Sequence, residues 1–140
     1  LSLKIKYSFP IIMLAIALVF IVISNAVLTS KLESNVDVFA NGFIPAIDRV
    51  LNADRDLYQA RVAELEAVAG NANFSDLKND FSENAKQALD RFNQYKSSMS
   101  DYPEVIGKLR QFDSIYTKWR NAAEQVFALV EQGNVAQAKL

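Results

Sequence analysis

The sequence predicts an all-α protein in which a transmembrane helix continues into an up-down four-helix bundle whose fourth helix is cut off. Residues 7–30 carry no charge, and a segment of that length can cross a bilayer, which needs ~20 residues per helical crossing. After this segment, apolar residues recur with helical spacing, and the 140 residues include only 4 Gly and 3 Pro. Apolar stripes separated by short turns favour an up-down bundle.

The composition excludes several kinds of chemistry. The chain has no Cys and no His, which excludes thiol nucleophiles, disulfides, Cys/His zinc sites and catalysis by an imidazole base. It has no Gly-rich phosphate loop, so we expect neither enzyme activity nor a cofactor. Lys and Arg total 15 against 16 Asp and Glu, with no basic patch, which argues against nucleic acid as a partner.

The apolar segment also predicts an orientation. Lys4 and Lys6 precede it and charges of both signs follow it. The positive-inside rule therefore places residues 1–6 in the cytoplasm, the apolar segment in the lipid bilayer and residues 31–140 outside. A cleaved signal peptide is the competing interpretation, because residues 24–26 form a small-x-small triplet. The apolar run continues past this triplet, which favours a retained anchor, and both interpretations export the remainder.

The first bundle helix is predicted over about residues 30–69. Its large apolar residues form two rows with seven-residue spacing: Val36, Phe43, Val50 and Leu57, and Ile44, Leu51, Tyr58 and Leu65. Two rows are wider than one coiled-coil seam requires, so we expect contacts both with the bundle core and with a second copy in a homodimer. The predicted dimer interface contains Ala40, Ile47, Val50 and Asp54. Pro45 predicts a bend or a loosened turn near the start of this helix.

A second helix is predicted over residues 75–98. Gly70 and the Asn-Ala-Asn that follows it form a turn, with Gly70 ending the preceding helix. Ser75 is the predicted N-cap of the second helix. One apolar stripe is expected to face the core: Leu77, Phe81, Ala85, Ala88, Phe92, Tyr95 and Met99.

A third helix is predicted over residues 103–132, because Pro103 followed by an acid is a helix start signal. Its predicted core stripe is Ile106, Leu109, Phe112, Tyr116, Trp119, Ala123, Val126 and Val130. Tyr116 and Trp119 could line a ligand pocket, but aromatic residues on such a stripe are more often core. Gly133 ends the helix, and Asn134 with Gln137 forms a capping box that opens a fourth helix.

A cluster of charged residues lies on the first bundle helix: Asp48, Arg49, Asp54, Arg55, Asp56, Arg61, Glu64 and Glu66. None of these acids has a base four residues away, so the usual pairing along one helix does not account for them. In one interpretation, Arg55 and Arg61, then Arg49, bind an anionic or amino-acid ligand beside Tyr58. In the other, the cluster forms ion pairs between helices that fix the register of the bundle or dimer.

Residues 45–60 contain the run Leu-Asn-Ala-Asp-Arg-Asp-Leu-Tyr-Gln. This stretch resembles the first periplasmic helix of bacterial methyl-accepting chemotaxis proteins, and the later Tyr116-x-x-Trp119 with the Gly133 turn is similar too. The resemblance implies a sensor in the bacterial inner membrane with residues 31–140 in the periplasm. It also implies a homodimer, a small-molecule ligand such as an organic acid or amino acid, and a cytoplasmic part that acts on a histidine kinase and its adaptor.

The arginines do not reproduce the close spacing found in the family's aspartate and serine receptors, so the ligand stays open. Two other functions also stay open. One is the sensor region of a membrane histidine kinase or cyclic-dinucleotide enzyme, and the other is a ligand-free, membrane-tethered structural protein.

Overall fold

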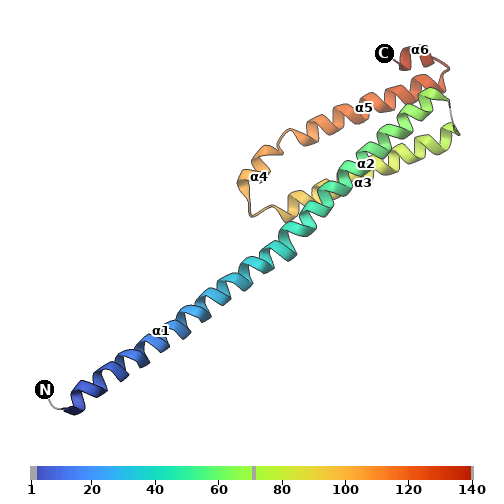
Figure 1. The fold of residues 1–140 in the computed structure, drawn as a ribbon. Coiled ribbons are helices and arrows are strands. Elements are labelled where there is room, and N and C mark those ends of the chain that lie inside the picture. The colour runs from blue at the N-terminus through green and yellow to red at the C-terminus, as the bar shows by residue number, and fades with distance from the viewer. Residues whose placement is uncertain (1–2, 71, 140) are drawn as a thin grey trace. The chain divides into compact units, whose positions relative to one another are not determined.

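The computed structural model describes residues 3–70 and 72–139, with side chains from residue 7 onward. Most of the described residues form helices and none of them forms a strand, which confirms the predicted all-α class. Along the chain the elements are α1 (Leu3–Asp37), the π-helix η1 (Val38–Phe43), α2 (Ile44–Ala69), α3 (Phe74–Ser98), α4 (Pro103–Lys108), α5 (Phe112–Glu131) and α6 (Val135–Ala138) (Figure 1). Residues 1–2 of the predicted cytoplasmic terminus, Asn71 of the predicted turn and Leu140 lie outside the described residues.

The chain divides into two units, and the first ends at Asn41. It consists of α1 and most of η1. The apolar side chains of α1 are exposed from Tyr7 to Leu32, and none packs against a protein core. By length and composition, α1 could span a membrane, and it is the one helix with this property in the described part of the chain.

A π-helix occupies the position where the sequence predicts a loosened turn. Residues are helical without a break from α1 through η1 to α2, and Pro45 lies in the first turn of α2. Proline has no backbone N–H, so the carbonyl of Asn41 loses the donor that an α-helix would supply. A wider π turn absorbs this defect without ending the helix. The predicted loosening near Pro45 is therefore confirmed.

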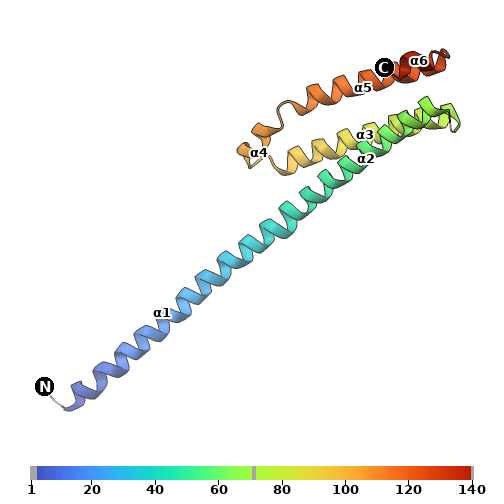
Figure 2. The ribbon, with the colours of Figure 1, turned by 45° about the horizontal axis from the view of Figure 1, so that its top comes forward.

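The second unit, which begins at Gly42, is a helical bundle. Helix α2 runs antiparallel to α3, and α5 returns alongside them (Figures 1 and 2). The central core consists of Ala60, Ala63, Ala67, Leu77, Phe81, Ala85, Ala123 and Phe127. The rings of Phe81 and Phe127 lie 5.1 Å apart between centroids, and Trp119 packs 5.6 Å from Phe81. Small residues on α2 thus face aromatic residues on α3 and α5.

The face of α2 that packs into the bundle is built from alanine. Ala46, Ala53, Ala60 and Ala67 repeat every seven residues and are all buried. The large apolar row predicted for this helix lies elsewhere, since Ile44, Leu51, Tyr58 and Leu65 are exposed. Of the two contacts expected for this helix, the bundle contact is therefore made by alanines, and this exposed row is available for a second copy. Alanine lets the backbones of α2 and α3 approach closely, and the helical period alone does not show which face turns inward.

The ends of α2 and α3 follow helix-capping chemistry. Gly70 has φ 71° and its N–H bonds the carbonyl of Glu66 at 2.9 Å, which confirms its predicted role as a helix end. The predicted N-cap, Ser75, was wrong. Asn73 caps α3 instead, because its side-chain oxygen accepts from the Ser75 N–H at 3.0 Å while its backbone is extended.

The predicted third helix, residues 103–132, is divided in two. Short-range bonds interrupt it, from the Leu109 N–H to the Ile106 carbonyl and from the Phe112 N–H to the Leu109 carbonyl, both 3.0 Å. Gly107 lies just before the break, and glycine costs ~1 kcal/mol relative to alanine inside a helix. The expectation of one continuous helix was therefore wrong, although Pro103 does start α4.

The end of α5 and the start of α6 were partly predicted. Gly133 (φ 78°) ends the helix, with Asn134 N–H bonded to the Leu129 carbonyl at 2.8 Å and Gly133 N–H to the Val130 carbonyl at 2.9 Å. These two bonds form a Schellman motif. A helical turn does begin after Asn134, but the Asn134 side chain makes no capping bond, so the predicted capping box was wrong.

Candidate functional site

The charged residues of α2 centre on Asp56, a carboxylate that is 0% exposed. Its Oδ1 accepts from Arg55 at 2.8 Å, and its Oδ2 lies 2.7 Å from Nε of Arg91 on α3. The Arg91 contact is ionic without hydrogen-bond geometry. A buried carboxylate costs several kcal/mol unless cations compensate it. Arg55 and Arg91 supply that compensation, and Arg91 does so from the neighbouring helix.

A second buried acid lies two helical turns further along α2. Glu64 is 5% exposed, and its Oε1 accepts a hydrogen bond from Arg61. Its Oε2 has no hydrogen-bond partner among the described residues. Arg61 is half exposed at its side chain. The second predicted ligand-binding arginine therefore also compensates an acid of its own helix.

The four predicted ligand-binding residues do not converge in the bundle. Arg49 donates to the Ser98 hydroxyl at 2.7 Å, while Arg55 and Arg61 hold Asp56 and Glu64. Six residues on a helix separate Arg55 and Arg61 by ~120° around the axis. Tyr58 is 72% exposed. Within one bundle, this arrangement brings no two of the arginines onto one carboxylate ligand, and their role as ligand anchors stays a prediction.

Tyr58 lines an open groove of about 560 Å³ between α2 and α3. The charged residues of this groove are acids, namely Glu66, Asp80 and Glu83. Such a surface does not complement an anion. The groove therefore gives no support to an anion site around Tyr58.

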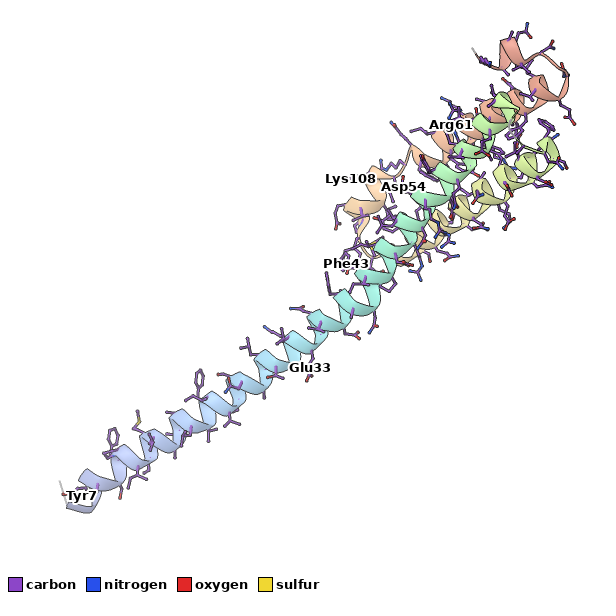
Figure 3. The ribbon with its side chains drawn as sticks, turned by 45° about the vertical axis from the view of Figure 1, so that its right-hand side comes forward. Tyr7, Glu33, Phe43, Asp54, Arg61 and Lys108 are labelled. Carbon is purple, nitrogen blue, oxygen red and sulfur yellow. The ribbon has the colours of Figure 1, made fainter. Side chains whose placement is uncertain are left out.

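The outward face of α2 carries a regular stripe, which we call the α2 seam. It consists of Ile44, Ile47, Leu51, Asp54, Tyr58, Arg61 and Leu65. All of these residues are exposed, with Leu51 at 64%. Their spacing alternates between three and four residues, which is the spacing of a coiled-coil seam. Figure 3 labels Asp54 and Arg61 on this helix, and they are the two charged members of the seam.

The predicted dimer-interface residues lie largely on exposed surface. Ile47 and Asp54 belong to the α2 seam, and Val50 beside it is half-buried. Ala40 is exposed in η1. In the described chain, no neighbouring helix covers Ile47 or Asp54, so both are available to a partner.

The aromatic pair of α5 belongs to the core. Tyr116 is buried and its hydroxyl donates to the Ala85 carbonyl at 2.7 Å. Burial raises the pKa of the Tyr116 phenol, which the nearby Arg120 opposes. Trp119 packs against the core cluster. The expectation that these aromatics are core residues is confirmed.

Sequence reasoning missed three features of the bundle. The first is Arg91, whose pairing with Asp56 has no local spacing signal because the two residues lie on different helices. The second is Phe127, which is 2% exposed but was absent from the predicted stripe; its spacing of four from Ala123 indicates the same face. The third is the pocket beside α4 described below. The described residues contain no group of three His, Cys, Asp or Glu side chains placed to hold a metal ion.

Comparisons of the chain with protein-family models, with curated proteins and with solved structures gave no match.

Proposed function

We propose that residues 1–140 form the membrane anchor and the periplasmic ligand-sensing bundle of a bacterial receptor of the methyl-accepting chemotaxis type. The module is not an enzyme; it passes a signal across the inner membrane to a histidine kinase and its adaptor. Three features support this proposal. They are the charge-free run in α1, the helical bundle that follows it, and the resemblance of residues 45–60 to the first periplasmic helix of that family.

The apolar surface of α1 supports its placement in a bilayer. Its large apolar side chains are exposed along the helix, and exposing so large an apolar surface to water is unfavourable in free energy. Lipid removes this cost, because the backbone polar groups of a helix are satisfied internally. Lys4 and Lys6 precede the apolar run, and the positive-inside rule favours a cytoplasmic N-terminus. The proposed receptor therefore has its bundle in the periplasm.

The observation that supports the dimeric part of the proposal is the α2 seam. Helix α2 contributes alanines to the bundle core, while five of its large side chains are exposed: Ile44, Ile47, Leu51, Tyr58 and Leu65. A second copy anchored in the same membrane would meet this face in parallel, with each seam residue near its own equivalent. The proposed assembly is a parallel homodimer with α2 at its two-fold axis.

The charged seam residues give such a dimer a property that suits a sensor. In a parallel pair, Asp54 would lie near Asp54 of the partner and Arg61 near its equivalent, and like charges oppose each other. Polar residues in a coiled-coil seam fix its register and lower its stability. A seam weakened in this way can shift between two packings at small cost, which is what a receptor needs to transmit a change along a helix.

Disulfide formation in membranes tests the dimer. Single cysteines at Ile47 and Asp54 should crosslink to their own copies, because both lie on the seam. Lys86→Cys, on an exposed position of α3, is the matched control and should not crosslink. The native chain contains no cysteine, so each variant reports one position. Crosslinking at residue 86 but not at residue 47 or 54 would contradict the proposed interface.

A ligand-free structural protein would form the same dimer, so sensing needs a separate measurement. Thermal unfolding of the anchored chain should shift upward with some members of a panel of organic acids and amino acids. A structural protein would show no such shift with any of them.

A further inference from the structure

A surface pocket of about 540 Å³, open to solvent, lies between the end of α3 and α4. Its volume falls in the range of small-molecule sites, about 300–1,000 Å³. Lys96, Ser97 and Ser100 line it from α3 and the following turn, and Pro103, Ile106 and Arg110 line it from α4 and just beyond. These residues were not part of any predicted site.

The polar side of this pocket fits one negative charge. Lys96 already shares its ammonium with Asp113, whose Oδ2 lies 2.9 Å away. Arg110 makes no ion pair within the described chain, and its guanidinium can grip a carboxylate through two parallel hydrogen bonds. The hydroxyls of Ser97 and Ser100 add donors. The pocket therefore offers one exposed cation without an ion-pair partner in the described chain, with neutral donors beside it.

The other side of the pocket is apolar and has room. Pro103 and Ile106 supply hydrocarbon surface. Gly107 also lines the pocket, and the space beside its Cα is open, as it is at the other three glycines. We propose that this pocket binds a small monocarboxylate with an apolar body, its carboxylate on Arg110 and its hydrocarbon part along Ile106. This inference rests on the proposed sensing function, because it names the ligand class and the site for it.

Two other grooves lined by described residues suit such a ligand less well. The groove between α2 and α3 presents carboxylates and no base. The groove between α3 and α5 contains Arg120, but Glu124 binds that guanidinium at 2.9 Å. In the α4 pocket, by contrast, an arginine without an ion-pair partner among the described residues lies beside an apolar wall.

Helix α4 can respond to an occupant. None of its residues is fully buried, and it lies between the turn at residues 99–102 and the break at residues 109–111. An element with so few buried contacts can shift without opening the core. The residue before it, Tyr102, packs its ring 5.0 Å from that of Phe43 in η1. Figure 3 labels Phe43 and, on α4, Lys108. A ligand that moves α4 would act through Tyr102 on the π-helix that precedes α2.

The test uses glycine labelling, because the chain has only 4 Gly. The full chain in lipid nanodiscs, labelled with 15N-glycine, is titrated with hexanoate and, separately, with hexylammonium. Hexanoate should shift the Gly107 signal saturably, shift Gly42 less, and leave Gly70 and Gly133 unchanged. Hexylammonium should not shift Gly107. Absence of a saturable Gly107 shift with hexanoate, or an equal shift with hexylammonium, would overturn the proposal.

Single variants test whether Arg110 and the space beside Gly107 contribute to hexanoate binding. Arg110→Gln should weaken hexanoate binding about tenfold or more, the usual effect of losing a charged hydrogen bond. Lys108→Gln, which removes a nearby α4 cation outside the pocket, should leave binding unchanged. Gly107→Leu should fill the cavity and abolish the ligand-observed saturation-transfer signal of hexanoate. Equal losses in the Lys108 and Arg110 variants would show nonspecific charge attraction and refute the site.

The result also separates this site from the proposed function. If hexanoate shifts the Gly107 signal without any effect on the dimer, the binding site is supported but its role in sensing is refuted. If the dimer responds to other metabolites while hexanoate does not shift the Gly107 signal, the sensing function is supported and the binding site is refuted.

Discussion

The ion pair between Asp56 and Arg91 offers a quantitative test of how α2 and α3 are joined. Arg91→Met would leave the fully buried Asp56 carboxylate with Arg55 as its remaining partner. Removing one partner of a buried pair costs ~3–5 kcal/mol. The Arg91 side chain is itself 33% exposed and Arg55 remains, so we expect a smaller loss, about 2 kcal/mol of unfolding free energy.

The double variant Asp56→Leu with Arg91→Met sharpens this prediction. It replaces both charges by apolar groups, and such replacements of buried pairs are often neutral or stabilising. Its free energy of unfolding should therefore lie within about 1 kcal/mol of the native chain, well above the Arg91→Met variant. The coupling between the two positions follows from the double-mutant cycle.

Urea unfolding followed by fluorescence provides the assay, because Trp119 is the one Trp in the sequence and packs against the core. Arg120→Met is the control, since it breaks an exposed pair with Glu124 and should cost less than about 1 kcal/mol. If Arg91→Met costs no more than this control, the ion pair does not join α2 and α3 as described. The same conclusion follows if the double variant is as unstable as the sum of its two single variants.

Three further predictions concern the helix ends and the core. Tyr116→Phe removes the hydrogen bond to Ala85 and should cost about 1 kcal/mol at neutral pH. Burial raises the Tyr116 pKa above its ordinary value of 10.0, so the neutral phenol stabilises the fold below pH 10 and this contribution is lost as the pH rises further. In urea melts, the difference in unfolding free energy between the native chain and Tyr116→Phe should therefore narrow above pH 10. A constant difference would contradict this. Gly70→Ala places a side chain at φ 71° and should lower the unfolding free energy of the bundle by about 1 kcal/mol in the same melts. An unchanged midpoint of urea unfolding would show that the turn can relax. Pro45→Ala restores a backbone N–H and should slow amide hydrogen exchange in η1 as the segment becomes α-helical; unchanged exchange would mean that Pro45 does not hold the π turn.

The sequence predicted the fold class and most helix limits because these depend on local signals. Helical spacing placed the α3 stripe correctly, from Leu77 to Phe92, since this helix has one apolar face and only that face can turn inward. Pro45 and Gly70 acted through their own backbones, as expected. Signals of this kind need no knowledge of the neighbouring helices.

The features that the sequence did not predict depend on contacts between helices. Helix α2 has an alanine face and a face of large apolar residues, and periodicity cannot choose between them. The structure buries the alanines and exposes Leu51 and Tyr58. Likewise, the sequence left two interpretations open for Arg55 and Arg61, as ligand-binding cations or as members of ion pairs. Only the packing of α2 shows that the acids beside them, Asp56 and Glu64, are buried and need them.

The central claim is that the bundle senses a small molecule and alters the dimer next to the membrane. Its most direct test is the rate of disulfide formation by Ala40→Cys in membranes, with and without each metabolite that raises the unfolding temperature of the bundle. We expect Ala40→Cys to crosslink between copies and at least one such metabolite to change the rate of crosslinking, while Lys86→Cys stays unreactive. Identical Ala40→Cys rates with every stabilising metabolite would contradict the sensor function.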